Sequence, residues 1–165
     1  MRVRKWILVL LVFLGVLSLT GCVTRHDLRP DSQYPSDYSV GAVYSTKEVL
    51  VARIVSRTVF FVFQRLVLLT FEAPTLISVD DLQPGGRWEK FSKYYVLVPK
   101  STLIRFERFT LEHNIAGSFV MVRGHILEGP FANHEIDLRG ISLRGHRTSL
   151  GELYMVDSRY LERVR

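Results

Sequence analysis

Cys22 has the most definite chemistry in this sequence, because it is the only cysteine and it follows an apolar segment. The chain opens with three basic residues, continues with a run of apolar or small residues over 6–17, and places small residues before Cys22. This order is typical of a secretory signal peptide. The run is too short for a permanent spanning helix, which needs about 20 apolar residues. The sequence therefore predicts a signal peptide over 1–21.

The four residues Leu19-Thr20-Gly21-Cys22 resemble the lipobox of bacterial lipoproteins. The resemblance implies that a diacylglycerol is joined to the Cys22 thiol, that cleavage falls between Gly21 and Cys22, and that membrane lipid is thereby a partner of the chain. It covers only the leader. Because Val23 rather than Asp follows the cysteine, the family pattern favours the outer membrane, facing the periplasm, over the inner membrane. The expected localisation is the cell envelope, outside the cytoplasm.

The expected export and the composition of the chain limit which partners the domain can have and what can stabilise its fold. With one cysteine, no intrachain disulfide is available, so the domain must be stabilised by its core. Removal of the leader takes three basic residues away and lowers the formal charge from +6 to +3. Export also excludes nucleic acid as the default partner of a basic chain, and it leaves anionic headgroups, cell-wall polymers or acidic protein surfaces.

The remaining residues with catalytic or metal-binding side chains form no recognisable motif. His125 and His134 flank a predicted turn and could meet across a hairpin, but exposed hairpin histidines are the alternative, and the five histidines lack metal-ligand spacing. Asp80 and Asp81 are adjacent, so on an extended chain they point to opposite sides and do not converge. No nucleophile elbow, phosphate loop or zinc-protease motif is present. We expect no catalytic residues, metal or cofactor, and no enzymatic activity.

Basic residues in the second half of the chain could form one face of the folded domain. Such a face would contact anionic headgroups or an acidic partner, although the same residues could serve only solubility. The residues concerned are Lys93, Lys100, Arg105, Arg108, Arg139, Arg144, Arg147, Arg159, Arg163 and Arg165.

The elements that position these side chains are predicted to be short strands. Residues 22–39 carry Pro, Asp and Ser without apolar periodicity, which predicts a lipidated N-terminus and a flexible tether. From residue 40 to 165, β-branched and aromatic residues gather in short runs, which predicts a β-rich globular domain. The expected strands cover 40–44, 48–55, 58–71 as two strands or one bent strand, 75–79, 94–98, 102–111, 117–128 and 135–144.

Two shifts in the alternation of apolar residues and a different pattern near the C-terminus add detail to the predicted strands. The phase of apolar residues shifts near Glu107-Arg108, which predicts a β-bulge, although a helix over the same residues is a competing interpretation. A second shift falls at Gly140, where a bend is easiest. Asp157 could cap a short helix reaching residue 165. The fold class is therefore mainly β, with a single small antiparallel barrel of the OB or SH3-like kind, or a β-sandwich, and a short C-terminal helix.

Two functions are compatible with these expectations. The first is a membrane-anchored, non-enzymatic accessory or structural interaction domain that binds an envelope protein. The second is a ligand-binding β-barrel module for lipid, glycan or peptide, whose ligand-binding residues and oligomeric state the sequence does not identify. The first requires an exposed sheet edge or apolar patch, and the second requires a concave pocket.

Overall fold

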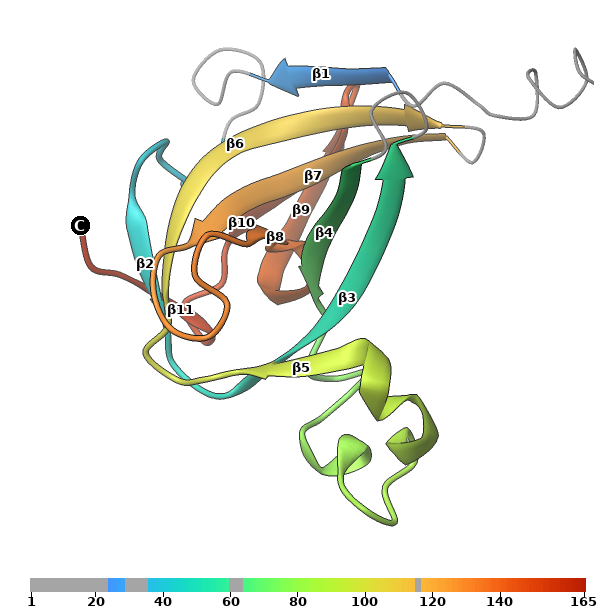
Figure 1. The fold of residues 1–165 in the computed structure, drawn as a ribbon. Coiled ribbons are helices and arrows are strands. Elements are labelled where there is room, and N and C mark those ends of the chain that lie inside the picture. The colour runs from blue at the N-terminus through green and yellow to red at the C-terminus, as the bar shows by residue number, and fades with distance from the viewer. Residues whose placement is uncertain (1–23, 29–35, 60–63, 115–116) are drawn as a thin grey trace, which may run out of the picture.

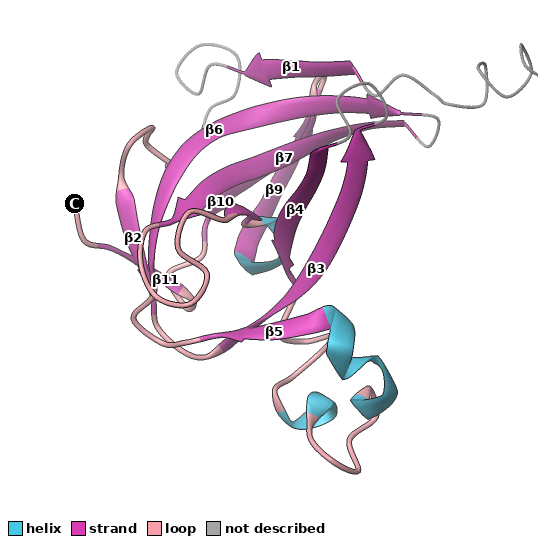
Figure 2. Ribbon diagram, viewed as in Figure 1, coloured by secondary structure: helices cyan, strands magenta, loops and turns pink. Residues whose placement is uncertain are grey.

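Strands dominate the fold in the computed structural model, which describes residues 24–28, 36–59, 64–114 and 117–165 (Figure 1). The helical segments of this part of the chain are three short 3-10 turns (Figure 2). The mainly β class expected from the sequence is confirmed. The strands are β1 (Thr24–Leu28), β2 (Val43–Thr46), β3 (Leu50–Val59), β4 (Gln64–Phe71), β5 (Tyr95–Val98), β6 (Leu103–Asn114), β7 (Gly117–Ile126), β8 (Glu135–Asp137), β9 (Ser142–Thr148), β10 (Gly151–Val156) and β11 (Leu161–Arg163), and the 3-10 turns are η1 (Asp80–Leu82), η2 (Glu89–Tyr94) and η3 (Arg139–Ile141).

One large curved sheet and one hairpin make up the architecture. The sheet has the order β11-β2-β6-β7-β8-β4-β3-β5, and β1 pairs with β6 beside β2. Strands β9 and β10 form a separate two-stranded sheet. Among the described residues β5 does not pair with β11, so the large sheet has two ends and does not form the closed barrel considered from the sequence. The sheet is also mixed rather than purely antiparallel, because β4 and β8 run parallel.

The core lies between the curved sheet and the β9–β10 hairpin. Val120 and Val122 of β7 belong to one buried cluster with Tyr154 of β10, and Leu153 of the same hairpin packs against that cluster. The alternation along β7 explains this, since every second side chain of a strand faces the same side of its sheet. The hairpin therefore covers the apolar face that the large sheet would otherwise expose.

The bulge predicted in β6 is confirmed. The pairing of β6 with β7 shifts register between Phe106 and Arg108. The extra residue changes the phase of the strand, so that Ile104 and Phe106 before it and Phe109 after it are all fully buried. A regular strand could not bury these side chains on one face, and the competing helix is not formed.

Part of the expected tether belongs to the fold. Residues 24–28 form β1, which pairs antiparallel with β6 from Thr24 opposite His113 to Leu28 opposite Phe109. On this side of β6, strand β2 covers only residues 103–105. The rest of that edge of β6 is therefore open to β1. Tyr38 is also buried, with its ring centroid 5.0 Å from that of Phe106. Packing of Tyr38 on the domain edge is an alternative that the sequence leaves open, whereas it gives no sign of β1, because 22–39 lacks apolar periodicity.

The expected strand over 75–79 is wrong. The Ala73 carbonyl accepts hydrogen bonds from the backbone N–H groups of Leu76 and Ile77, which folds this segment into a turn after Pro74. Ile77 is nevertheless buried. Its apolar character reflects packing of a loop against the sheet rather than membership of a strand.

The expected C-terminal helix is also wrong. Asp157 accepts hydrogen bonds from the Arg159 backbone N–H and guanidinium, and the Asp157 carbonyl accepts from the Leu161 N–H, so one tight turn forms. The chain then continues as β11, which pairs with β2 from Leu161 opposite Thr46 to Arg163 opposite Tyr44. The open edge of β2 provides backbone partners to three residues, and this tertiary pairing prevails over the local capping signal.

A buried group of charges links four strands on the face of the sheet opposite the core. Arg123 of β7 is 1% exposed, and its Nη2 lies 2.6 Å from Oε1 of Glu112 of β6. Nη2 of Arg25 of β1 approaches the same oxygen at 2.9 Å. Nε of Arg123 is 3.4 Å from Glu135 of β8, an ion pair without hydrogen-bond geometry. Burial of these charges is tolerable only while they compensate one another.

We expect Glu112→Gln to lower the free energy of unfolding by about 3 kcal/mol, because the buried Arg123 guanidinium loses its shortest ion pair. Glu135→Gln is the matched control, since its side chain is 25% exposed and its contact is longer, and it should cost less than about 1 kcal/mol. Urea unfolding followed by circular dichroism measures both. Equal losses in the two variants would show that Arg123 does not depend on Glu112.

Gly140→Ala should also destabilise the domain, by about 3 kcal/mol, because an added Cβ would overlap the Phe71 carbonyl oxygen and the backbone would have to move. Gly145→Ala is the control. There the nearest atom to an added Cβ is a flexible Leu153 side-chain carbon at 3.3 Å, so the loss should be small. The same unfolding measurement compares them, and a stable Gly140→Ala protein would contradict the close approach of η3 to β4.

Candidate functional site

The residues with the most definite predicted chemistry, Gly21 and Cys22, lie outside the described residues. Within the described part of the chain, no helix has both the length and the apolar character needed to cross a membrane. The same part contains no group of three or more His, Cys, Asp or Glu side chains that could hold a metal ion.

The two histidines considered as metal ligands have separate partners. Nδ1 of His125 is 2.8 Å from Oε1 of Glu107. Nδ1 of His134 is 3.1 Å from the Phe131 carbonyl oxygen, within its own turn. His125 of β7 is therefore held by a carboxylate of the neighbouring strand β6, and His134 is held within its own turn.

Asp80 and Asp81 do not form a convergent carboxylate pair. The Asp81 carboxylate accepts hydrogen bonds from the Ser78 backbone N–H and hydroxyl, both at 2.9 Å, and it also binds Arg87. The Ser78 N–H, followed by the Ser78 hydroxyl, lowers the pKa of Asp81 below its usual value. Asp81 is thus a turn-stabilising residue, as its position beside the Pro84-Gly85-Gly86 turn suggests.

Of the ten basic residues considered as one face, three gather at a hollow. Several of the others are occupied elsewhere: Arg105 lies near Glu107, Arg108 near Asp27, and Arg159 binds Asp157. Arg139, Arg144 and Arg147 line one concavity of about 410 Å³. We name it the basic groove, and its lining residues are Ser118, Phe119, Val120, Arg139, Arg144, Arg147, Gly151, Glu152 and Tyr154.

Two elements carry the arginines of the basic groove. Arg139 begins η3, where its Nε and Nη2 each lie 2.8 Å from Oδ2 of Asp137, a fully buried carboxylate that fixes the guanidinium. Arg144 and Arg147 lie on β9 and are exposed. Nε of Arg144 is 3.8 Å from Glu152, whereas Arg147 has no ion pair with any residue in the described part of the chain.

The floor of the basic groove is closely packed and its hydroxyl group stays protonated. Gly151 approaches Val120 so closely that an added Cβ would lie 3.1 Å from a Val120 methyl carbon. The Tyr154 hydroxyl donates a hydrogen bond to Glu152 at 2.9 Å. Burial, followed by this hydrogen bond, raises the pKa of Tyr154 to about 12. The groove therefore places guanidinium donors beside a phenol that is neutral at ordinary pH.

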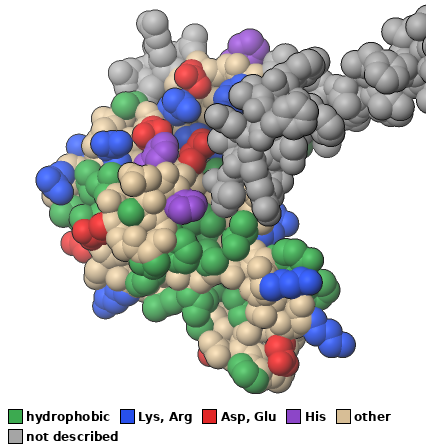
Figure 3. All heavy atoms as spheres, viewed as in Figure 1, with side chains coloured by type: hydrophobic (Ala, Val, Ile, Leu, Met, Phe, Trp, Pro, Cys, Tyr) green, Lys and Arg blue, Asp and Glu red, His purple; other side chains and the backbone are tan. Residues whose placement is uncertain are grey.

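A second surface, apolar and remote from the basic groove, surrounds β5. We name it the apolar surface, and its exposed members are Val49, Phe91, Tyr94 and Leu97. Figure 3 shows apolar side chains gathered around this strand. β5 is the last strand of the sheet order. Its outer backbone edge and the apolar side chains beside it are therefore presented together.

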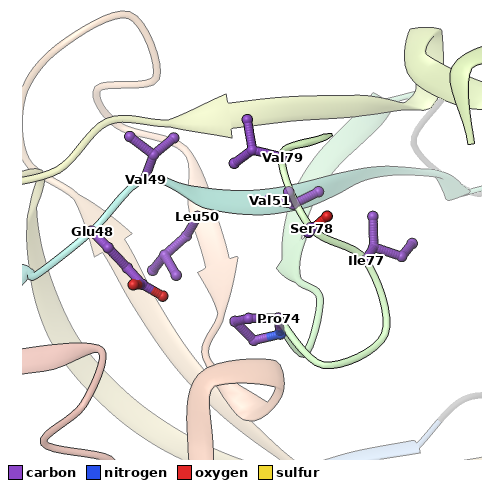
Figure 4. A pocket seen from close by; sticks show the side chains of 8 residues that line it. All are labelled: Glu48, Val49, Leu50, Val51, Pro74, Ile77, Ser78 and Val79. Atoms are coloured by element: carbon purple, nitrogen blue, oxygen red, sulfur yellow. The ribbon is translucent and has the colours of Figure 1, made fainter. Parts of the chain in front are cut away.

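A hollow of about 200 Å³ adjoins the apolar surface, at the start of β3 (Figure 4). Leu97 of β5 pairs with Val51 of β3, so the two side chains share a face of the sheet with Val49. Most of the lining is apolar. The lining residues are Glu48, Val49, Leu50, Val51, Pro74, Ile77, Ser78 and Val79. Sequence reasoning missed this hollow because it assigned 75–79 to a strand.

The comparisons with known proteins add no relative. No protein-family model, no curated protein and no solved structure matches this chain. The basic groove and the apolar surface are accordingly the two features from which function is argued.

Proposed function

We propose that this chain is a membrane-anchored lipoprotein of the cell envelope, and that its β-rich domain is a non-enzymatic interaction module for an envelope protein. The leader and the Leu19-Thr20-Gly21-Cys22 motif support the anchor. The observation that carries the interaction role is the apolar surface beside the terminal strand β5.

The chemistry of β5 suits a partner segment in extended conformation. A terminal strand offers unpaired N–H and C=O groups along its outer edge, and a partner strand can pair with them. Leu97, which is 38% exposed, and Val49, which is 45% exposed, lie on one face beside the hollow. Backbone pairing would give affinity, and the apolar hollow would select the partner's side chains.

The position of β1 supports the same role. β1 starts two residues after Cys22, so chain length limits the distance between their Cα atoms to about 7 Å. β1 and β5 lie on opposite sides of the molecule in Figure 1. An acyl anchor at Cys22 would therefore hold the β1 side at the membrane and leave β5 available to a partner in the periplasm.

The second function, ligand binding, is favoured by one observation, the basic groove. Because the large sheet does not close among the described residues, a barrel mouth is not the binding place. The groove instead offers three guanidinium groups to a ligand that carries negative charge. The two functions are compatible, since the apolar surface and the groove are formed by different elements.

Cys22→Ala tests the anchor. We expect the native protein to leave the membrane fraction only with detergent and to carry the mass of a diacylglyceryl group on residue 22, whereas the variant should lack that mass. Val23→Ala, which keeps the cysteine and the three residues before it, is the control. An intact leader or an unmodified thiol in the native protein, measured by intact mass spectrometry, would overturn the anchor.

Site-specific photo-crosslinking in intact cells tests the interaction role. A photoreactive residue in place of Leu97 should give a protein adduct, because this side chain lies at the centre of the apolar surface. The same residue in place of Leu143, which is 45% exposed on β9, is the matched control and should give none. The Leu97 adduct should weaken when the Cys22→Ala change is added. Absence of an adduct at Leu97, or equal adducts at both positions, would contradict the proposal.

A further inference from the structure

The basic groove has the donor set that a phosphate group requires. Guanidinium groups are planar forks of N–H donors that match the oxygen atoms of a phosphate. Arg139 is held in place by the buried Asp137, and Arg147 has no ion pair within the described residues. Among the described residues that line the groove, Glu152 is the one carboxylate, and it accepts the Tyr154 hydroxyl hydrogen bond. The lining therefore carries an excess of positive charge.

The basic groove lies at the same end of the domain as the expected anchor. Thr24 of β1 pairs with His113 of β6, and His113 pairs with Ser118 of β7, which lines the groove. Neighbouring strands are about 4.8 Å apart, so Thr24 and Ser118 are separated by roughly 10 Å across the sheet. Cys22 precedes Thr24 by two residues. A bilayer that holds acyl chains on Cys22 would therefore lie beside the groove.

An exposed aromatic residue beside the groove fits such a position, although strand alternation directs its ring to the face of β7 opposite Ser118 and Val120. Phe119 lines the groove and is 39% exposed. An aromatic side chain next to cationic groups is a combination suited to the boundary between headgroups and acyl chains, where the ring packs against apolar atoms and the cations meet phosphates. A soluble phosphate compound would make no use of this ring.

We propose that the basic groove binds the phosphate of an anionic phospholipid headgroup in the same membrane that holds the acylated Cys22. This inference rests on the proposed lipid anchor. Arg144 and Arg147 contact the phosphate, Arg139 closes the groove from η3, and Phe119 enters the interface. The acyl chains and the headgroup together fix the orientation of the domain, so that β5 faces away from the bilayer.

The test uses the full lipidated chain, extracted in detergent and titrated with phosphatidylglycerol or phosphatidylcholine while native mass spectrometry counts the bound lipids. The wild type should prefer phosphatidylglycerol. The Arg144→Gln/Arg147→Gln pair should weaken phosphatidylglycerol binding by about thirty-fold, since each basic residue near an anionic surface contributes about a fivefold effect. Arg163→Gln/Arg165→Gln removes the same charge on and beside β11 and should change binding less than threefold.

Other results of the lipid titration would show which part of the proposal is wrong. Equal weakening by the two pairs of substitutions, or equal binding of the two lipids by the wild type, would overturn the groove as a headgroup site. Full competition by glycerol phosphate at the same concentration would assign the groove to a soluble phosphate compound instead. The intact mass of each sample reports acylation of Cys22 independently, so a failed anchor is distinguished from a failed groove. Matching circular dichroism spectra confirm that the variants are folded.

Discussion

The ion pair between Arg123 and Glu112 is the constraint on which the arrangement of the sheet depends. A guanidinium that is 1% exposed has lost nearly all contact with water, and the desolvation of such a charge is offset only by close carboxylate partners. Those partners come from β6 and β8, and Arg25 of β1 shares the oxygen that Arg123 uses. Four strands must therefore be in register at once, and a slip of one residue in β7 would move Arg123 into the apolar core.

This constraint also determines where the N-terminal end of the domain lies. Arg25 pairs with Glu112 in register, and Leu28 at the other end of β1 is buried against the core. β1 is thus held by charge at one end and by apolar packing at the other. In the proposed lipoprotein, this short strand determines which surface meets the bilayer. The basic groove lies near it, and β5, which carries part of the apolar surface, lies on the opposite side of the molecule (Figure 1).

The features that sequence reasoning predicted correctly are those that local pattern controls. The shift in apolar phase located the bulge between Phe106 and Arg108, and Gly140 located the bend between β8 and β9. The features it missed depend on contacts between distant residues. β1 forms because β6 is longer than β2, which leaves part of the β6 edge unpaired by β2. β11 forms because the other edge of β2 is available for pairing. Neither edge can be identified from the local sequence. The groove is a further example, since Arg139, Arg144 and Arg147 line one concavity with Val120 only after β7 and the hairpin have packed together.

The pairing of β11 with β2 has a consequence for the order of folding. Its two strands lie near opposite ends of the described domain, so the edge at β2 can close only when nearly the whole chain is present in one compartment. A chain transferred across a membrane from its N-terminus would expose β2, β6 and β7 before their last neighbours arrive. Domains in which strands distant in sequence must pair fold slowly, and strands that are still unpaired during folding favour aggregation. If the chain is exported as proposed, chaperone protection during transfer would thus matter more than its modest size suggests.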